Sequence, residues 1–156
     1  MIKIIGLCIV LFTIYYACSR VINTRRQREA LVLKLFELVG FLRDGIALYM
    51  RPLPQLYSSF RWGVLAEYGF PDVLLRGGWR SGGLWAAVGD EVAEILIPLL
   101  DGLGTHGYAE ELACLDRARE RLSSVLDGVR GRAERTRRLA VTLALSLSLA
   151  ITILVI

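Results

Sequence analysis

Both ends of the chain are apolar, and arginines border each apolar stretch on its inner side. The first stretch runs from Ile4 to about Ala17, and the second fills Leu139 to Ile156 without a charged residue. Arginine side chains stay on the side of a membrane from which a segment is inserted. We therefore expect one transmembrane helix at each terminus and a cytoplasmic domain between them. The arginines expected to contact lipid headgroups are Arg20, Arg25, Arg26, Arg28, Arg130, Arg132, Arg135, Arg137 and Arg138.

The charge distribution favours a division into an N-terminal membrane anchor (1–19), a cytoplasmic helical domain (20–138) and a C-terminal transmembrane helix (139–156). The whole chain carries a net charge of +4, yet between Glu29 and Asp127 fourteen acidic residues outnumber nine basic ones. The positive charge therefore lies beside the apolar ends, where each arginine near anionic lipid contributes roughly 1 kcal/mol. Nucleic-acid binding needs a basic face on the domain itself, and the central residues predict none.

The run from Tyr15 to Cys18 offers an alternative for the first segment. It loosely resembles a bacterial lipoprotein cleavage site, in which Cys18 would carry the lipid and the domain would lie outside the cytoplasm. Tyr15 stands where such sites usually have Leu, and the N-terminal arginine cluster would have to cross the membrane. An uncleaved anchor is the favoured interpretation. The segment is short for a spanning helix, which typically needs about 20 residues.

Small side chains recur at every fourth position of the last segment, at Ala140, Ala144, Ser148 and Thr152. Stripes of this kind let helix backbones approach closely in lipid. Two interpretations remain open: small residues are common in membrane helices, or the stripe packs against the first segment or against a copy of it. A homo-oligomer held by this stripe would be a purely structural membrane stator, which is the alternative function.

Two long helices are predicted to run antiparallel, because the first leaves the membrane and the last returns to it. The first extends from about Arg25 to Met50, with apolar residues on one face at helical spacing, and the prolines that follow should end it. The last begins near Tyr108 and continues into the C-terminal segment. Its seam repeats every seven residues, at Leu115, Leu122 and Val129.

The intervening residues predict shorter helices. Helical turns are expected around Leu56 to Tyr68 and Pro71 to Leu75, followed by a loop at Gly77-Gly78 and a helix from Leu84 to Leu103. Pro98 should kink or divide that helix. Half of the aromatic residues of the chain concentrate in this middle section, so it should build the core of the domain. No alternating strand pattern is present, and the expected fold class is all-α.

The residues predict no enzyme, no cofactor and no metal site. His106 is the only histidine, and it lies in a glycine-rich turn without a nucleophile. The three cysteines lack metal-binding spacing, and Cys114 should be a small core residue. The paired glycines are not followed by the Lys-Ser/Thr of a phosphate loop.

Taken in order, these segments resemble the stage III sporulation protein AB family of endospore-forming bacteria. The resemblance rests on the short N-terminal anchor, the run Ile-Ala-Leu-Tyr-Met-Arg-Pro-Leu-Pro from Ile46 to Pro54, and a Leu-rich helix ending in Leu103-Gly104. A long helix that enters a C-terminal membrane segment completes it. The family usually has an acidic residue three positions after the Leu-Gly pair, where this chain has Gly107.

The resemblance implies a mother-cell membrane component of the channel that links mother cell and forespore. The family's soluble domain is similar to the helical cytoplasmic domains of the type II secretion and type IV pilus platform protein. By analogy the partners are the sporulation ATPase, stage III sporulation protein AA, and other channel subunits. The candidate partner surface is the membrane-distal end of the domain, although a solvated face is the simpler interpretation of its carboxylates. Its residues are Asp72, Asp90, Glu91, Asp101, Gly104, His106 and Gly107.

Overall fold

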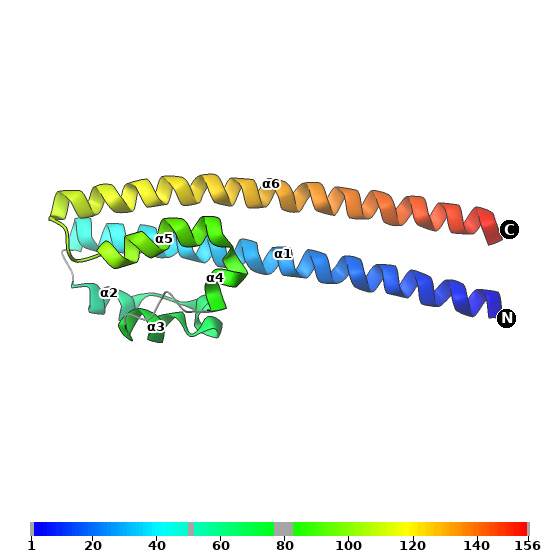
Figure 1. The fold of residues 1–156 in the computed structure, drawn as a ribbon, viewed down its shortest axis with the longest axis horizontal. Coiled ribbons are helices and arrows are strands. Elements are labelled where there is room, and N and C mark those ends of the chain that lie inside the picture. Colours follow the sequence, from blue (N-terminus) through cyan, green and yellow to red (C-terminus); the bar gives the residue numbers. More distant parts are fainter. Residues whose placement is uncertain (1, 50–51, 77–82, 156) are drawn as a thin grey trace. The chain divides into compact units, whose positions relative to one another are not determined.

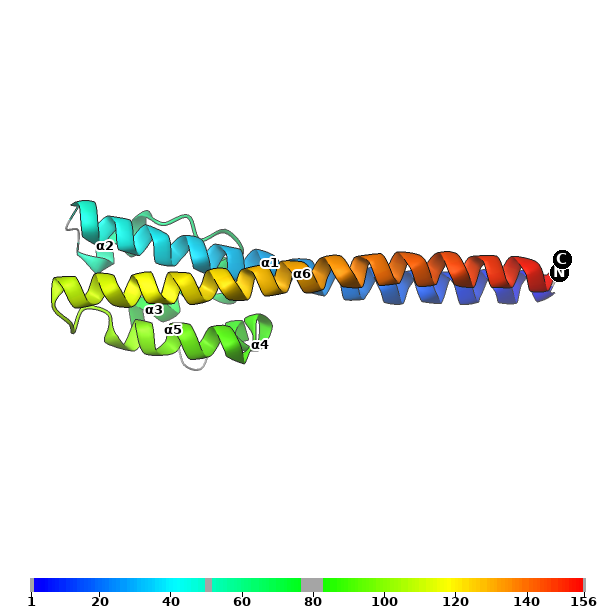
Figure 2. The same ribbon diagram turned by 90° about the horizontal axis from the view of Figure 1, so that it is seen from above.

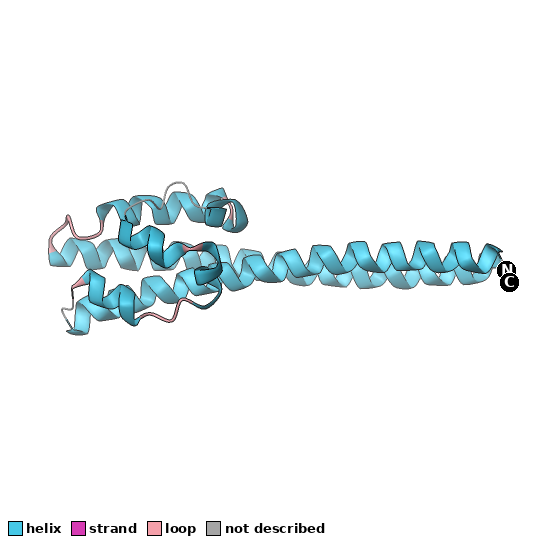
Figure 3. Cartoon of the chain, turned by 90° about the horizontal axis from the view of Figure 1, so that it is seen from below, coloured by secondary structure: helices cyan, strands magenta, loops and turns pink. Residues whose placement is uncertain are grey.

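The computed structural model describes residues 2–49, 52–76 and 83–155, apart from the side chains at 2–11, 14, 18, 49, 73, 137 and 147–155. Within these ranges the chain is helical and has no strand, which confirms the all-α prediction (Figures 1 and 3). The elements are α1 (Ile2–Tyr49), α2 (Leu53–Ser59), the 3-10 helix η1 (Gly63–Tyr68), α3 (Phe70–Arg76), α4 (Gly83–Val88), α5 (Asp90–Gly102) and α6 (Tyr108–Val155).

The chain forms two compact units. The terminal unit comprises Met1–Gln27 and Val129–Ile156, and the central unit comprises Arg28–Gly128. The long helices α1 and α6 each contribute one part to either unit. The boundaries expected after residue 19 and before residue 139 both fall inside the terminal unit.

In the central unit, α1 and α6 lie side by side and run antiparallel (Figures 1 and 2). The Tyr108 hydroxyl donates a hydrogen bond to the Ala47 carbonyl oxygen at 3.2 Å, and Arg43 Nε donates to Asp116 Oδ1 at 2.8 Å. The predicted apolar faces form the core between them. Its fully buried leucines include Leu35 on α1 and Leu122 on α6.

Aromatic side chains continue the core beyond the long helices. A row of ring contacts links Phe41 of α1 to Phe60, Trp62, Phe70 and Trp85, with centroids 5.1 to 6.2 Å apart. The last three contacts are edge-on, the geometry that aromatic rings favour. This row confirms that the middle section builds the core. The predicted Gly77-Gly78 loop lies outside the described residues.

The helix expected from Leu84 to Leu103 divides at Gly89 and not at Pro98, so of the two expected effects of Pro98, a kink or a division, the division was wrong. Gly89 has φ +94°, and a Cβ there would lie 2.6 Å from Arg28 Nη2. Only glycine suits this backbone and this close approach. Pro98 lies inside α5, at an exposed position. The carbonyl group that loses its hydrogen bond belongs to Glu94, which is also exposed, so helix continuity costs less there than in a core.

The terminal unit has a different surface. Large apolar side chains are exposed on both of its helical segments, including Phe12 at 70% and Leu145 at 67%. Within the described part of the chain, no helix combines the length and apolar character needed to cross a membrane. Both predicted spans include positions whose side chains lie outside the described residues. The side chain of Cys18, the alternative lipidation site, also lies outside them.

Candidate functional site

The connection between α5 and α6 forms a tight turn at one end of the central unit. Gly104 has φ +86°, a left-handed conformation that glycine adopts without strain. Its N–H donates a hydrogen bond to the Glu111 carboxylate in the first turn of α6. The Thr105 hydroxyl donates to the Gly102 carbonyl oxygen at 2.7 Å. These bonds hold the backbone of the turn in one conformation.

Helix α2 packs against this turn. A Cβ on Gly104 would lie 3.4 Å from Leu53 Cδ1, which is ordinary contact distance. Burial raises the pKa of the neighbouring Tyr57 hydroxyl above its usual value of 10.0, and the negative charge of Glu111 raises it further. The Tyr108 hydroxyl ties the start of α6 to the end of α1 through Ala47. Four elements therefore meet at this end of the central unit.

His106 lies on the surface of the turn. Its Nδ1 is 3.9 Å from Glu110 Oε2, and its Nε2 is 2.9 Å from the position that a Cβ on Gly102 would take. The cavity beside it has a volume of only about 30 Å³, enough for about one water molecule. His106 is therefore an exposed surface side chain, and the cavity beside it is too small for a substrate.

The residues predicted to form a single partner surface are only partly brought together. Asp101, Gly104, His106 and Gly107 share the turn. Asp90 and Glu91 lie in the first turn of α5, at the opposite end of that helix, roughly 16 Å away along the axis. Asp72 lies on α3.

The start of α5 therefore lies at the other end of that helix from the α5–α6 turn. The Arg28 Nε, near the boundary with the terminal unit in sequence, donates a hydrogen bond to the Val88 carbonyl oxygen at 2.9 Å. Val88 precedes Asp90 by two residues, so this bond holds the start of α5 beside Arg28 of α1. Asp90 and Asp101 belong to the same unbroken helix, α5, so the helical rise between them sets their separation.

Three residues that contact or adjoin the turn were not predicted to do so: Glu111, Tyr57 and Tyr108. The sequence signal for Glu111 is a pair of acidic residues that follows a glycine-rich break, an arrangement favoured by a helix N-terminus. No comparable signal marks Tyr57, because its approach to Glu111 depends on how α2 packs.

A second depression lies between α5 and α6, with a volume of about 250 Å³. Its lining combines Ile95, Pro98 and Leu99 with Cys114, Arg117 and Arg121. Cys114 is half-buried at this depression, not a core residue as predicted, and its Sγ lies 3.3 Å from Arg117 Nη2.

The predicted headgroup arginines differ in their surroundings. Arg25 and Arg26 are exposed, and Arg20 Nη2 donates to the Tyr16 hydroxyl at 3.2 Å. Arg138 pairs with Glu134 at 2.8 Å. Arg28 is engaged by Val88 in the central unit, and a lipid contact there would have to compete with that hydrogen bond. The side chain of Arg137 lies outside the described residues.

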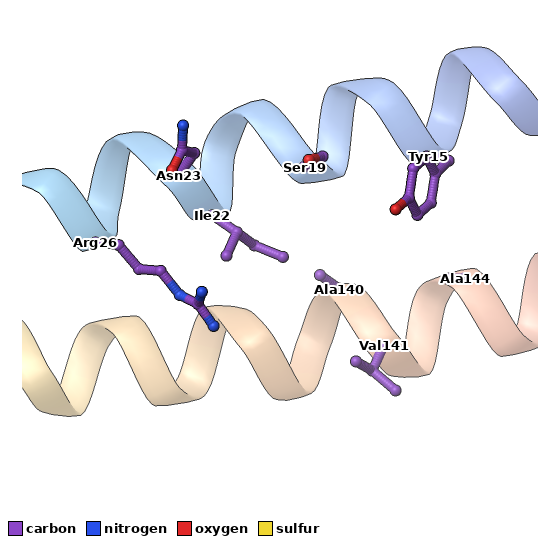
Figure 4. Close-up of a pocket in the computed structure, with 8 residues that line it drawn as sticks. All are labelled: Tyr15, Ser19, Ile22, Asn23, Arg26, Ala140, Val141 and Ala144. Carbon is purple, nitrogen blue, oxygen red and sulfur yellow. The ribbon is translucent and has the colours of Figure 1, made fainter.

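The described half of the small-residue stripe faces α1 of the same chain. Ala140 and Ala144 line a cavity of about 350 Å³ together with Tyr15, Ser19, Ile22, Asn23, Arg26 and Val141 (Figure 4). The side chains of Ser148 and Thr152 lie outside the described residues. Both interpretations of this stripe therefore stay predictions, because Ala140 and Ala144 border a cavity here.

Among the described residues, no group of three or more His, Cys, Asp or Glu side chains is arranged to hold a metal ion. Comparison of the chain with protein-family models, with curated proteins and with solved structures finds no match.

Proposed function

We propose that the protein is a non-enzymatic adaptor of the cell membrane, a subunit of a secretion-like channel assembly of sporulation. The terminal unit attaches to the membrane through both chain ends, and the central unit lies in the cytoplasm. There it receives an ATPase and couples it to the membrane assembly.

The exposed apolar surface of the terminal unit is the observation that supports this proposal most directly. Phe12 and Tyr15 on α1 and Leu143 and Leu145 on α6 are all more than half exposed. Water contact with such side chains costs about 25 cal/mol for each Å² of apolar surface. Lipid removes that cost, and the adjoining arginines suit anionic headgroups. Tyr16 beside Arg20 is the kind of pair that occurs at a membrane–water interface.

The α5–α6 turn is the proposed ATPase-binding surface. Its backbone is held by hydrogen bonds from Gly104 and Thr105, so little conformational entropy would be lost on binding. It presents Asp101 and His106 at exposed positions. The choice of stage III sporulation protein AA as the ATPase rests on the family resemblance.

The proposal can be tested with the full chain in nanodiscs and the purified sporulation ATPase. We expect saturable binding, weakened about tenfold when Asp101→Asn and His106→Ala are combined, the size of effect typical of a central interface position. Asp90→Asn is the matched control, since it removes one carboxylate from the other end of the same helix. Equal weakening of ATPase binding by both variants would mean that binding depends only on the overall charge of the chain, which would contradict the assigned surface. Absence of binding by a helical, membrane-bound chain would contradict the adaptor function.

A further inference from the structure

The cavity between the two helices of the terminal unit has one charged end and an apolar body (Figure 4). Arg26, Ile22 and Tyr15 extend from α1 toward α6, and Ala140 faces them from α6. The methyl side chains of Ala140 and Ala144 do not fill the space opposite Ile22 and Tyr15. The cavity therefore results from small residues opposite larger ones, within a pair of adjoining helices.

Arg26 supplies the positive charge of the cavity. In the described part of the chain its guanidinium makes no hydrogen bond and no ion pair. The acidic residue of the adjoining α6 segment, Glu134, is already paired with Arg138. Arg26 thus has five N–H donors and a full charge available for an anion. A phosphate group is suited to it because guanidinium can bind two phosphate oxygens at once.

The rest of the cavity excludes a simple inorganic anion as the best occupant. From Arg26 to Tyr15 it follows α1 for roughly 16 Å, and most of its α6 side is formed by Ala140, Val141 and Ala144. The volume of about 350 Å³ is at the lower end of the range for small-molecule sites. An amphiphile with an anionic head and a hydrocarbon chain matches both the charge and the lining.

We infer that this cavity binds one anionic phospholipid. Its phosphate lies at Arg26, and one acyl chain passes Ile22 toward Tyr15 along Ala140 and Ala144. The lipid fills the space that the small side chains leave and neutralises an arginine at the same time. Basic pockets between membrane helices bind anionic lipid headgroups by this combination. The inference rests on the proposed membrane attachment of the terminal unit.

Retention of lipid by the purified full chain tests this site. The chain is extracted from vesicles of equal phosphatidylglycerol and phosphatidylcholine, and native mass spectrometry counts the lipids that remain. We expect one retained phosphatidylglycerol, reduced about fivefold in Arg26→Gln, the effect of one cation at an anionic lipid. Arg25→Gln is the matched control, because Arg25 is also exposed and does not line the cavity. It should retain the lipid at the parent level.

A second pair of variants tests the apolar body. Ala144→Leu fills the cavity and should lower retention, whereas Ser146→Leu adds the same bulk to an exposed position outside it. Displacement of the lipid by inorganic phosphate alone would show that the site recognises a free anion and would overturn the inference. Equal retention of both phospholipids, or equal losses in Arg26→Gln and Arg25→Gln, would also overturn it.

Flotation of the same chain with the vesicles separates this inference from the membrane proposal. A chain that floats but shows no Arg26-dependent retention overturns the lipid site alone. A chain that does not float overturns both.

Discussion

The same two helices bury their apolar residues in one unit and expose them in the other. In the central unit Leu35 of α1 and Leu122 of α6 have no exposed surface, because α5 and the aromatic row surround the helix pair. In the terminal unit only two helical segments lie together, and Phe12 and Leu145 remain mostly exposed. Two helices cannot cover each other's apolar surface in full. The contrast teaches that helical pattern alone does not set burial; the number of surrounding elements, or the surrounding solvent, does.

The largest expected change in stability comes from truncating a buried side chain in the central unit. Leu122→Ala should lower the free energy of unfolding of the central unit by about 2 to 5 kcal/mol, since it leaves a cavity in a packed core. Leu145→Ala, the control in the terminal unit, should change it by less than about 0.5 kcal/mol. Tryptophan fluorescence during urea unfolding in detergent measures this, because all three tryptophans lie in the central unit. Similar losses in both variants would erase the contrast.

The turn between α5 and α6 offers the next largest effect. Gly104→Ala should cost about 1 to 2 kcal/mol of stability, because alanine is strained at φ +86°. Gly107→Ala is the control, since a Cβ there meets no atom within 4 Å. Thermal unfolding of the full chain, followed by tryptophan fluorescence, compares the two. If they are equally stable, the turn is not held in the left-handed conformation.

Two glycines of α1 separate packing from helix propensity inside the central unit. A Cβ at Gly45 would collide with both methyl groups of the buried Leu56, so Gly45→Ala should destabilise by about 1 kcal/mol after its gain in propensity. At Gly40 the nearest atom is Arg119 Nε at 3.8 Å, so Gly40→Ala should stabilise by up to about 1 kcal/mol. Opposite signs in urea midpoints are the expected result. A gain in both variants would show that Leu56 moves aside without cost.

The smallest effect is a pH dependence. The pKa of Tyr57 is raised in the folded chain by burial and by Glu111. Above about pH 10 the unfolded chain loses this proton more readily than the folded chain, so stability falls as the pH rises from the ordinary tyrosine pKa toward the folded one. Urea unfolding of the parent and Tyr57→Phe chains between about pH 9 and 11 measures this. The variant should show a flatter decline, and identical declines would contradict the burial of this hydroxyl.

Much of the central unit could be predicted from local patterns. Leu31, Leu35, Leu38 and Leu42 are spaced three or four residues apart, so they share one face of the helix. The structure buries this same face. The prolines after α1 and the glycines before α6 are local signals too, because they mark where one helix ends and the next begins. These signals need no knowledge of distant residues.

The features that escaped prediction depend on contacts between distant residues. Gly89 stands at the break between α4 and α5 and lies against Arg28, which is far away in sequence, whereas Pro98 is tolerated because its position faces solvent. The separation of Asp90 from Asp101 is different, because it follows from the length of α5 alone and was already implied by the predicted helix. The cavity at Arg26 depends on which α1 residues lie opposite Ala140 and Ala144.

The location of the terminal unit is the central claim, and brominated phospholipids test it directly. Their bromines quench tryptophan only at close range within the hydrocarbon region, and the native tryptophans all belong to the central unit. In vesicles of brominated lipid, the parent chain should keep its fluorescence. A chain carrying Leu143→Trp, at an exposed position of the terminal unit, should show an additional component that is quenched. Quenching of the native tryptophans, or an unquenched tryptophan at position 143, would contradict the account.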